Sequence, residues 1–191
     1  WVNFLQDLKK SGGLPTDLWI TSSDNFASWG GAGTEYHVED LNKLYEAVDY
    51  VSMHTYPYHN THYNPDFWGI SEEELGLSKE EQIKAAMFRA LQFAQNQYKN
   101  VKEYVGRINS SKAVHIGETG WATTSNGLYG PEGSMATDEY KQALYYGLMR
   151  DWTNEAGISC FYFEAFNEPW KDAGNQKGSE NHFGLFTVDG K

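Results

Sequence analysis

Helix-type and strand-type patterns alternate along these 191 residues, and this alternation limits the possible folds more than any other feature. The order is one helix, then three strand–helix pairs, then a final strand. This alternation predicts a parallel sheet with covering helices. The expected helices lie at residues 1–11, 38–48, 78–105 and 138–156, and the expected strands at 18–21, 49–56, 113–118 and 158–166.

Local signals set several of these boundaries. Ser78 and Glu81 have the spacing of a capping box, which predicts the start of the longest helix. Thr137 or Asp138 is expected to cap the last helix, and Gly157 to end it. The nearly continuous apolar run 158–166 predicts a strand whose two faces are both covered.

The connections are expected to be loops. Residues 22–36 form a polar loop, and a long loop containing Trp68 precedes the capping box. The run Gly127 to Gly133 predicts a glycine-rich loop. The GGAG run at 30–33 lacks the lysine and the spacing of a phosphate cradle, which favours a flexible loop.

A doubly wound sheet and a barrel both fit the alternation, and the position of the polar residues favours the barrel. They cluster where each expected strand ends, as at the active-site rim of a (β/α)8 barrel. Four strands make only half of such a barrel, so we expect residues 1–191 to form a single partial TIM-barrel domain. Because a helical pattern is already under way at Trp1, we also expect the chain to be a piece of a longer one. The polar clusters lie at residues 22–25, 54–58, 118–121 and 164–170.

Composition excludes several functions. The net charge of −11 argues against a nucleic-acid partner or an anionic membrane surface. No stretch has the length of a membrane span. The single cysteine, Cys160, rules out an internal disulfide and leaves the compartment open. With 7 Trp and 13 Tyr, the chain has the aromatic content of a large core or of a carbohydrate-binding cleft.

The segment 113–124, AVHIGETGWATT, combines a strand with a candidate catalytic group. Glu118 follows the β-branched residues of the strand and lies between two glycines that would let a ligand approach. A carboxylate there can attack or stabilise an anomeric carbon, and the indole of Trp121 would offer a flat face to a pyranose ring. A capping or surface carboxylate remains the alternative for Glu118 on local grounds.

Three motifs in one order extend this interpretation: HTYPY at 54–58, GETGW at 117–121, and the pair NEPWK at 167–171 with ENHFGLF at 180–186. Together they resemble glycoside hydrolase family 17, the β-1,3-glucanases and β-1,3-glucanosyltransferases of clan A. The resemblance runs from about residue 18 to residue 186. It implies that the four strands are strands five to eight of the barrel, and that the substrate is a β-1,3-glucan oligosaccharide.

The resemblance also implies roles for individual residues. Glu118 occupies the position of the catalytic nucleophile, and Tyr56 that of a tyrosine able to donate a hydrogen bond to it. Glu168 and Lys171 match a carboxylate and a lysine that family members hold near the nucleophile, and Lys171 near Glu168 would keep these groups ionised. Glu180 matches a third supporting acid. The implied substrate-binding set is Tyr56, Trp121, Glu168, Trp170, Lys171 and Glu180, with no metal and no cofactor. Family members suggest a secreted, periplasmic or cell-wall location.

The chain departs from the family pattern in one respect. The family's general acid/base is a glutamate in an Asn-Glu motif on strand four, whereas Asn167-Glu168 matches the strand-eight motif. We therefore expect a retaining site that lacks its proton donor and is inactive alone, and the alternative is a non-catalytic glucan-binding half-domain. Exposed sheet edges of a half barrel also predict a homodimer, in which a partner's glutamate could approach Glu118.

Other chemistries are less well supported. His54, His59 and His62 have an irregular spacing across a proline turn, which favours a polar sugar-binding loop over a metal site. The sequence has no GxSxG motif and no context for a reactive cysteine, so an acyl-transfer hydrolase is disfavoured.

Overall fold

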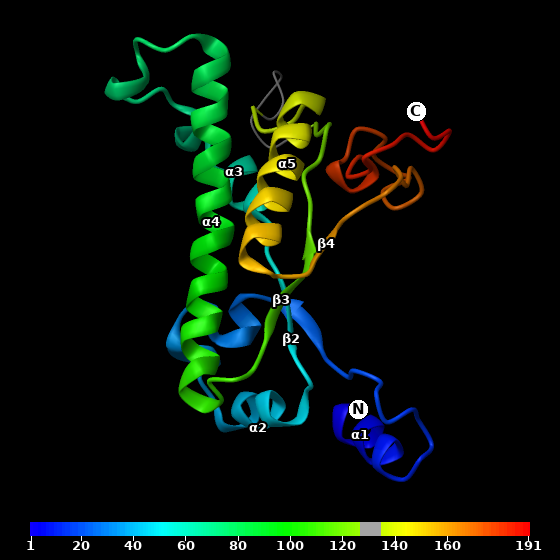
Figure 1. Ribbon diagram of the computed structural model, residues 1–191. Coiled ribbons are helices and arrows are strands. Elements are labelled where there is room, and N and C mark those ends of the chain that lie inside the picture. Colours follow the sequence, from blue (N-terminus) through cyan, green and yellow to red (C-terminus); the bar gives the residue numbers. More distant parts are fainter. Residues whose placement is uncertain (127–134) are drawn as a thin grey trace. The chain divides into compact units, whose positions relative to one another are not determined.

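The computed structural model describes residues 1–126 and 135–191. Figure 1 shows its helices and strands. Within these two ranges, four strands form one sheet in the order β1-β2-β3-β4. Ser23 pairs with Ser52 and His54 with Glu118 in parallel register, so the predicted parallel α/β class is confirmed. The strands are β1 (Ser23–Asn25), β2 (Val51–His54), β3 (Val114–Thr119) and β4 (Cys160–Tyr162).

In the part of the chain that the structure describes, five α-helices accompany the strands: α1 (Val2–Lys10), α2 (Glu39–Ala47), α3 (Pro57–His62), α4 (Lys79–Ile108) and α5 (Glu139–Ala156). The described residues also contain a π-helical segment at Ala27–Gly31 and short 3₁₀ turns at Thr34–Tyr36, Pro65–Trp68, Glu72–Glu74 and Ser179–Asn181. No helix of this described part combines the length and apolar character that crossing a membrane requires.

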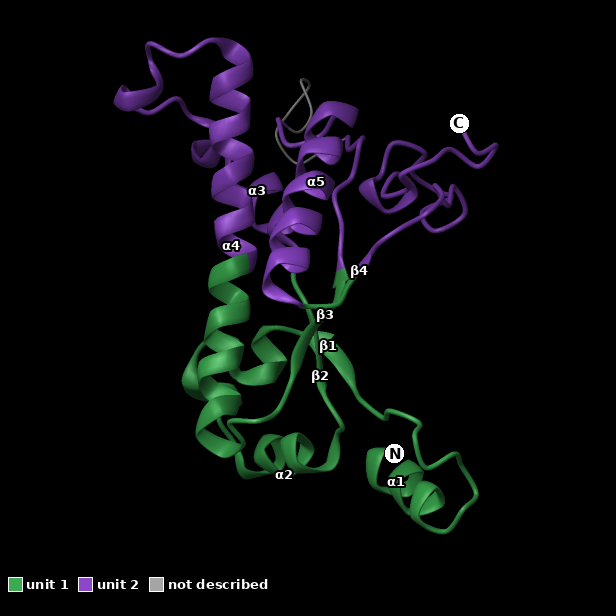
Figure 2. Ribbon diagram, viewed as in Figure 1, with its two compact units in different colours: residues 1–55, 95–118, 158–160 green, residues 56–94, 119–157, 161–191 purple. Residues whose placement is uncertain are grey.

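The chain divides into two compact units (Figure 2). Unit 1 comprises Trp1–Thr55, Gln95–Glu118 and Ile158–Cys160, and unit 2 comprises Tyr56–Ala94, Thr119–Gly157 and Phe161–Lys191. Helix α4 and strands β3 and β4 therefore contribute to both units. The expectation of one partial barrel domain over residues 1–191 stays a prediction.

The core of unit 1 fixes the end of β2. Val51, Met53 and Ile116 are completely buried on the two neighbouring strands. The indole N–H of Trp29 donates a hydrogen bond of 3.0 Å to the carbonyl of Ser52. Because these contacts leave the strand little freedom, the residues that follow Met53 have a defined direction.

The core of unit 2 forms around aromatic rings and one glutamine. Trp121, Tyr145 and Phe183 are almost completely buried, and the Tyr145 hydroxyl lies 2.8 Å from that of Thr119. The side-chain amide of Gln142 donates to the carbonyls of Trp121 and Phe183. These hydrogen bonds fix the segments that follow β3 and β4 to α5.

The caps predicted from the sequence are present. The Glu81 amide donates to the Ser78 hydroxyl at 3.3 Å, and the Ser78 amide donates to the Glu81 carboxylate at 2.9 Å, so the capping box starts α4. Asp138 accepts from the Lys141 amide at the start of α5, and Gly157, with φ of 64°, ends it. The predicted helices at both positions are confirmed.

Two strand predictions need correction. The predicted strand 18–21 is wrong, because the first strand is β1, inside the expected polar loop. Leu18 and Trp19 are 42% and 67% exposed, and only Ile20 of this apolar run is buried in the core, at 4% exposed. The last strand is shorter than predicted, and Phe161 is 65% exposed, which contradicts the expectation that both faces are covered.

The expected long loop after β2 contains a helix, because α3 begins at Pro57, a residue suited to the first turn of a helix. The expected glycine-rich loop at 127–133 lies outside the described residues.

Candidate active site

Three neighbouring strands place polar side chains together in unit 1. His54 and Glu118 are paired in the parallel register of β2 and β3, and Ser23, the first residue of β1, is paired with Ser52, two residues before His54. His54 Nδ1 lies 2.9 Å from Glu118 Oε2, and His54 Nε2 lies 2.6 Å from Ser23 Oγ. The Glu118 side chain is 31% exposed, so its carboxylate is oriented by the protein and still accessible to a ligand.

Gly117 lies against this hydrogen-bonded group. A Cβ atom at position 117 would lie 2.0 Å from Ser52 Oγ and 2.7 Å from Ser23 Oγ. A Cβ at Gly120 would lie 2.1 Å from the carbonyl oxygen of Phe163. The sequence-based interpretation that these glycines admit a ligand is therefore corrected, since protein atoms occupy the space that they leave.

A second group of charges lies in unit 2. Lys171 Nζ is 2.5 Å from Glu168 Oε2 and 3.0 Å from Glu164 Oε2, and it lies 3.9 Å from the centroid of the Phe163 ring. The predicted proximity of Lys171 and Glu168 is thereby confirmed. The Glu164 side chain is only 13% exposed. Lys171 thus forms ion pairs with two carboxylates in a partly buried environment.

The two carboxylates of this group have opposite pKa shifts. Burial, together with the adjacent Glu168, raises the pKa of Glu164 to about 6, although the Lys171 ammonium opposes this. Hydrogen bonds from Lys171 and then from Glu164 lower the pKa of Glu168. Burial acts to lower the pKa of Lys171, but its hydrogen bonds to both glutamates outweigh burial and raise it. Glu164 is therefore the member that takes up a proton in mildly acidic solution.

Backbone pairing with residues 183–186 positions this second group. The Leu185 amide donates to the Glu164 carbonyl at 2.9 Å, and the Phe186 amide donates to the Ala165 carbonyl at 3.0 Å. The Gly184 amide donates to the Asn167 side chain at 2.9 Å. The NEPWK motif and the residues just before it are therefore hydrogen-bonded to the ENHFGLF motif, which explains why the two motifs occur together.

The other predicted residues of unit 2 lie in different settings. Tyr56 is half-buried, and its ring centroid lies 5.4 Å from that of His59 and 6.0 Å from that of Phe183. Its hydrogen bond to Glu118 stays a prediction. Trp170 is 64% exposed. Glu180 is exposed, and its charge opposes the effect of burial, which lowers the pKa of His59.

Trp121 does not have the position expected for a sugar platform. Its side chain is completely buried, and its indole N–H donates to the Ala136 carbonyl at 2.9 Å. Because Tyr58, Trp68 and Tyr145 pack around the ring, neither face is free for stacking. We therefore assign Trp121 to the core of unit 2.

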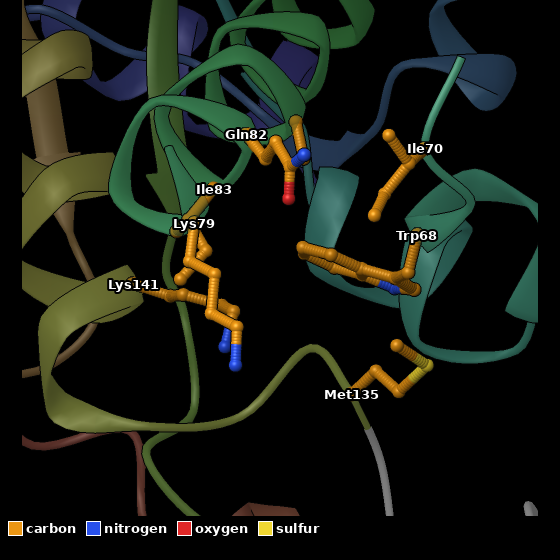
Figure 3. Close-up of a pocket in the computed structure, with 8 residues that line it drawn as sticks. Trp68, Ile70, Lys79, Gln82, Ile83, Met135 and Lys141 are labelled. Atoms are coloured by element: carbon orange, nitrogen blue, oxygen red, sulfur yellow. The ribbon is translucent and has the colours of Figure 1, made fainter. Parts of the chain in front are cut away.

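A pocket of about 330 Å³ in unit 2 also carries an aromatic ring. Figure 3 shows Trp68 on one side of the pocket and the side chains of Lys79 and Lys141 on the other. Ile70 and Met135 add apolar surface. The Lys141 ammonium lies 5.8 Å from the centroid of the Trp68 ring. The pocket is thus mainly apolar with two cationic groups at its edge.

The histidines considered as metal ligands have separate positions. His54 contacts Glu118, whereas His59 and His62 lie on α3, where burial lowers the pKa of both. Across residues 1–126 and 135–191, no three His, Cys, Asp or Glu side chains are arranged to hold a metal ion.

Sequence reasoning missed Ser23, His54 and Glu164 as members of these two groups. His54 belongs to the HTYPY motif, and its place two residues before the end of the expected strand 49–56 was a usable signal. Glu164 precedes the NEPWK motif by three residues. Ser23 lies in the polar cluster 22–25, but nothing in the sequence singles it out, because its role depends on a strand whose three residues are all polar.

A family model described as the BtgE/BtgC glycoside hydrolase domain matches residues 18–184. A glucan 1,3-beta-glucosidase of Arthroderma benhamiae is 41% identical over 90 residues, which cover 43% of this chain and 27% of that protein. The matched region thus spans about a quarter of that curated relative.

Solved structures agree with this match. An endo-laminarinase from Formosa Hel1_33_131 is 64% identical with a TM-score of 0.94, over all of this chain and 48% of that one. A glycoside hydrolase family 17 β-1,3-glucanosyltransferase from Rhizomucor miehei is 20% identical with a TM-score of 0.59, over 98% of this chain and 53% of that one, a likeness of fold alone. The predicted half of a (β/α)8 barrel is confirmed.

Proposed function

Because the chain belongs to the BtgE/BtgC glycoside hydrolase domain family, which is similar to glycoside hydrolase family 17, we propose that it supplies the nucleophile side of a retaining site for β-1,3-glucan. Glu118 is the nucleophile. The observation that carries this proposal is the accessible Glu118 carboxylate at the end of β3, held at 2.9 Å by His54. The 64% identity to an endo-laminarinase supports the choice of substrate.

The reaction has two displacements. A Glu118 oxygen attacks the anomeric carbon, and the glycosidic oxygen leaves with its electron pair and takes a proton from a general acid. Water or a sugar hydroxyl then displaces Glu118 from the glycosyl-enzyme. We assign substrate binding to Tyr56, Glu168, Trp170, Lys171 and Glu180, whose charges and exposed indole suit hydroxyl groups and a sugar ring.

A complete retaining site needs a general acid in addition to the nucleophile. The resemblance assigns that role to an Asn-Glu motif on the fourth barrel strand, and residues 1–191 have no counterpart at that place in the motif order. Losing general acid catalysis costs typically about 10²–10⁴-fold in rate. We therefore expect these residues alone to degrade laminarin very slowly, so the test should not depend on a proton donor.

A laminaribioside with fluorine at C2 and a dinitrophenolate leaving group meets this need, because dinitrophenolate departs without protonation. We expect covalent labelling at one site, measured by intact mass and peptide mapping to Glu118. Glu118→Gln should prevent the labelling. Labelling of wild type at another carboxylate, or unchanged labelling of the variant, would refute the assignment.

A glucan-binding role without cleavage is the second candidate, and the exposed indole of Trp170 favours it. Aromatic faces stack on sugar rings. Binding of laminarin by calorimetry, with no new reducing ends and no labelling by the fluorinated glycoside, would support this role. Trp170→Ala should then weaken binding while leaving the melting temperature unchanged, and Trp19→Ala is an exposed-indole control in unit 1.

Self-association is a further part of the proposal. Phe161 on β4 is 65% exposed and Phe166 is 52% exposed, although both lie in an apolar segment. Exposed strands with apolar side chains tend to pair with another chain. We expect a dimer in sedimentation velocity at low micromolar concentration, and Phe161→Lys should shift it toward monomer. A monomer in the wild-type protein would contradict this expectation.

A further inference from the structure

A continuous line of hydrogen-bonding groups leads to Glu118 in unit 1. Ser52 Oγ lies 2.9 Å from Ser23 Oγ, which lies 2.6 Å from His54 Nε2, and His54 Nδ1 lies 2.9 Å from Glu118 Oε2. We infer that Ser23 and His54 are positioning residues for the nucleophile, with Ser23 selecting the tautomer of His54 that can donate to Glu118. This inference rests on the proposed role of Glu118.

The direction of the hydrogen bonds follows from what each group can donate. A carboxylate only accepts, so His54 Nδ1 carries the proton that points to Glu118. In a neutral imidazole the other nitrogen then accepts, and Ser23 donates its hydroxyl hydrogen to His54 Nε2. Since that hydrogen is committed, Ser52 donates to Ser23. Each donor thus points toward the carboxylate and strengthens the next one.

The hydrogen bond from His54 affects both the orientation and the charge of the Glu118 carboxylate. A neutral imidazole fixes one oxygen of Glu118 without adding a formal positive charge that would compete for its electrons. The other oxygen, Oε1, remains available to attack an anomeric carbon. A displacement of about 1 Å at a reacting atom costs on the order of 10² in rate. His54 therefore contributes through Glu118 and does not itself touch the sugar in this scheme.

The packing shows that the serine pair fits a defined space. Gly117 directly precedes the nucleophile, and a Cβ there would lie 2.0 Å from Ser52 Oγ. The indole of Trp29 donates a hydrogen bond to the Ser52 carbonyl and holds the backbone of that serine. Ser52 is 6% exposed, so its hydroxyl is held beside Ser23 Oγ.

The test uses the fluorinated dinitrophenyl laminaribioside on the full 191-residue chain, and it measures the rate of covalent labelling. His54→Ala should slow labelling about 10²-fold. His54→Asn keeps an N–H near the position of Nδ1 and should recover most of the rate, whereas His54→Gln, whose amide lies nearer the position of Nε2, should not. Ser23→Ala should slow labelling about 3- to 10-fold, and Ser22→Ala is the matched control.

A spectroscopic measurement separates positioning from a merely structural role. The ¹⁵N–¹H correlation spectrum of wild type should show His54 protonated at Nδ1, and Ser23→Ala should shift this tautomer balance toward Nε2. Ser23→Thr, which retains a hydroxyl, should restore both the tautomer and the labelling rate. Circular dichroism of each variant checks that the fold is kept.

The outcomes separate the two proposals. No labelling of wild type overturns the proposed nucleophile and this inference with it. Labelling of wild type with equal rates in His54→Ala and Ser23→Ala overturns only the inference. Modification of Ser23 by a fluorophosphonate would also overturn it, because His54 would then activate the serine instead of orienting Glu118.

Discussion

The two carboxylate sites of this chain hold their acids by different means. In unit 1, Glu118 receives a hydrogen bond from His54, a residue that is itself held by Ser23. In unit 2, Glu164 and Glu168 share the ammonium group of Lys171. By our inference, the first site orients one carboxylate with neutral groups, whereas the second compensates two carboxylates with one formal charge.

This difference suits different tasks. A cation at hydrogen-bond distance stabilises a carboxylate but reduces its tendency to share electrons with an electrophile. A hydrogen-bonded line of neutral groups fixes the orientation of a carboxylate and leaves its negative charge uncompensated. We therefore expect Glu118 to act in bond formation, and the group around Lys171 to support folding and hold sugar hydroxyls.

The largest expected effect compares Glu118→Gln with Glu168→Gln. The first removes the proposed nucleophile and should reduce labelling by the fluorinated glycoside at least about 10³-fold, while the second should reduce it only about 10-fold. Intact-mass time courses measure both rates. Equal losses in the two variants would contradict the division of roles.

The next effect is on stability. Lys171→Met leaves the little-exposed Glu164 without its cation, and the free energy of unfolding at pH 7 should fall by about 1–3 kcal/mol. The loss should shrink at pH 4, where Glu164 binds a proton. Urea unfolding followed by tryptophan fluorescence measures this, with the exposed Lys177→Met as control. A loss independent of pH would assign the effect of Lys171 to packing alone.

Glu164→Gln isolates the cost of the buried charge. Because the folded pKa of about 6 lies above the ordinary value of 4.5, Glu164 contributes stability below about pH 4.5 that is lost as pH rises through 6. Glutamine does not titrate, so the variant should gain up to about 2 kcal/mol relative to wild type between pH 4 and pH 7. Urea unfolding at each pH, with the exposed Glu155→Gln as control, measures the gain. A relative loss over that range would show that the lysine contact outweighs burial.

The smallest effect is that of salt. The Lys171 side chain is 29% exposed, so 1 M NaCl should reduce the stability difference between wild type and Lys171→Met by less than about 1 kcal/mol. The labelling rate at Glu118 with an uncharged probe should change less than about twofold, because the donors to Glu118 are neutral. A labelling rate as sensitive to salt as the stability difference would remove the contrast between the two sites.

The sequence was most informative where structure depends on near neighbours. Ser78 and Glu81 are three residues apart, and Asp138 caps the amide of Lys141, so local chemistry alone predicts both helix starts. Strand β1 depends instead on pairing with β2. In this pairing Ser23 lies opposite Ser52, which is twenty-nine residues later in the chain. Its three residues are polar and exposed, and no periodicity indicates them.

The sites were predictable to a similar extent. The motifs predicted Glu118, Glu168 and Lys171, and the charges of unit 2 are close together as expected. Trp121 was misassigned because burial of an indole depends on Tyr58 and Tyr145, which come from distant parts of the chain. His54 and Ser23 acquire their partners only through the parallel register of three strands.

Because Gly117 has no side chain, the size of the residue at position 117 limits which residue can occupy position 52. An alanine there requires the hydroxyl of Ser52 to leave, because the two atoms would otherwise lie 2.0 Å apart. Among related sequences, residues 52 and 117 should therefore vary as a pair, with a larger residue at 117 accompanied by a smaller one at 52. A library that randomises both codons together should recover such combinations, whereas single changes at 117 should be absent from the fraction that the fluorinated glycoside labels.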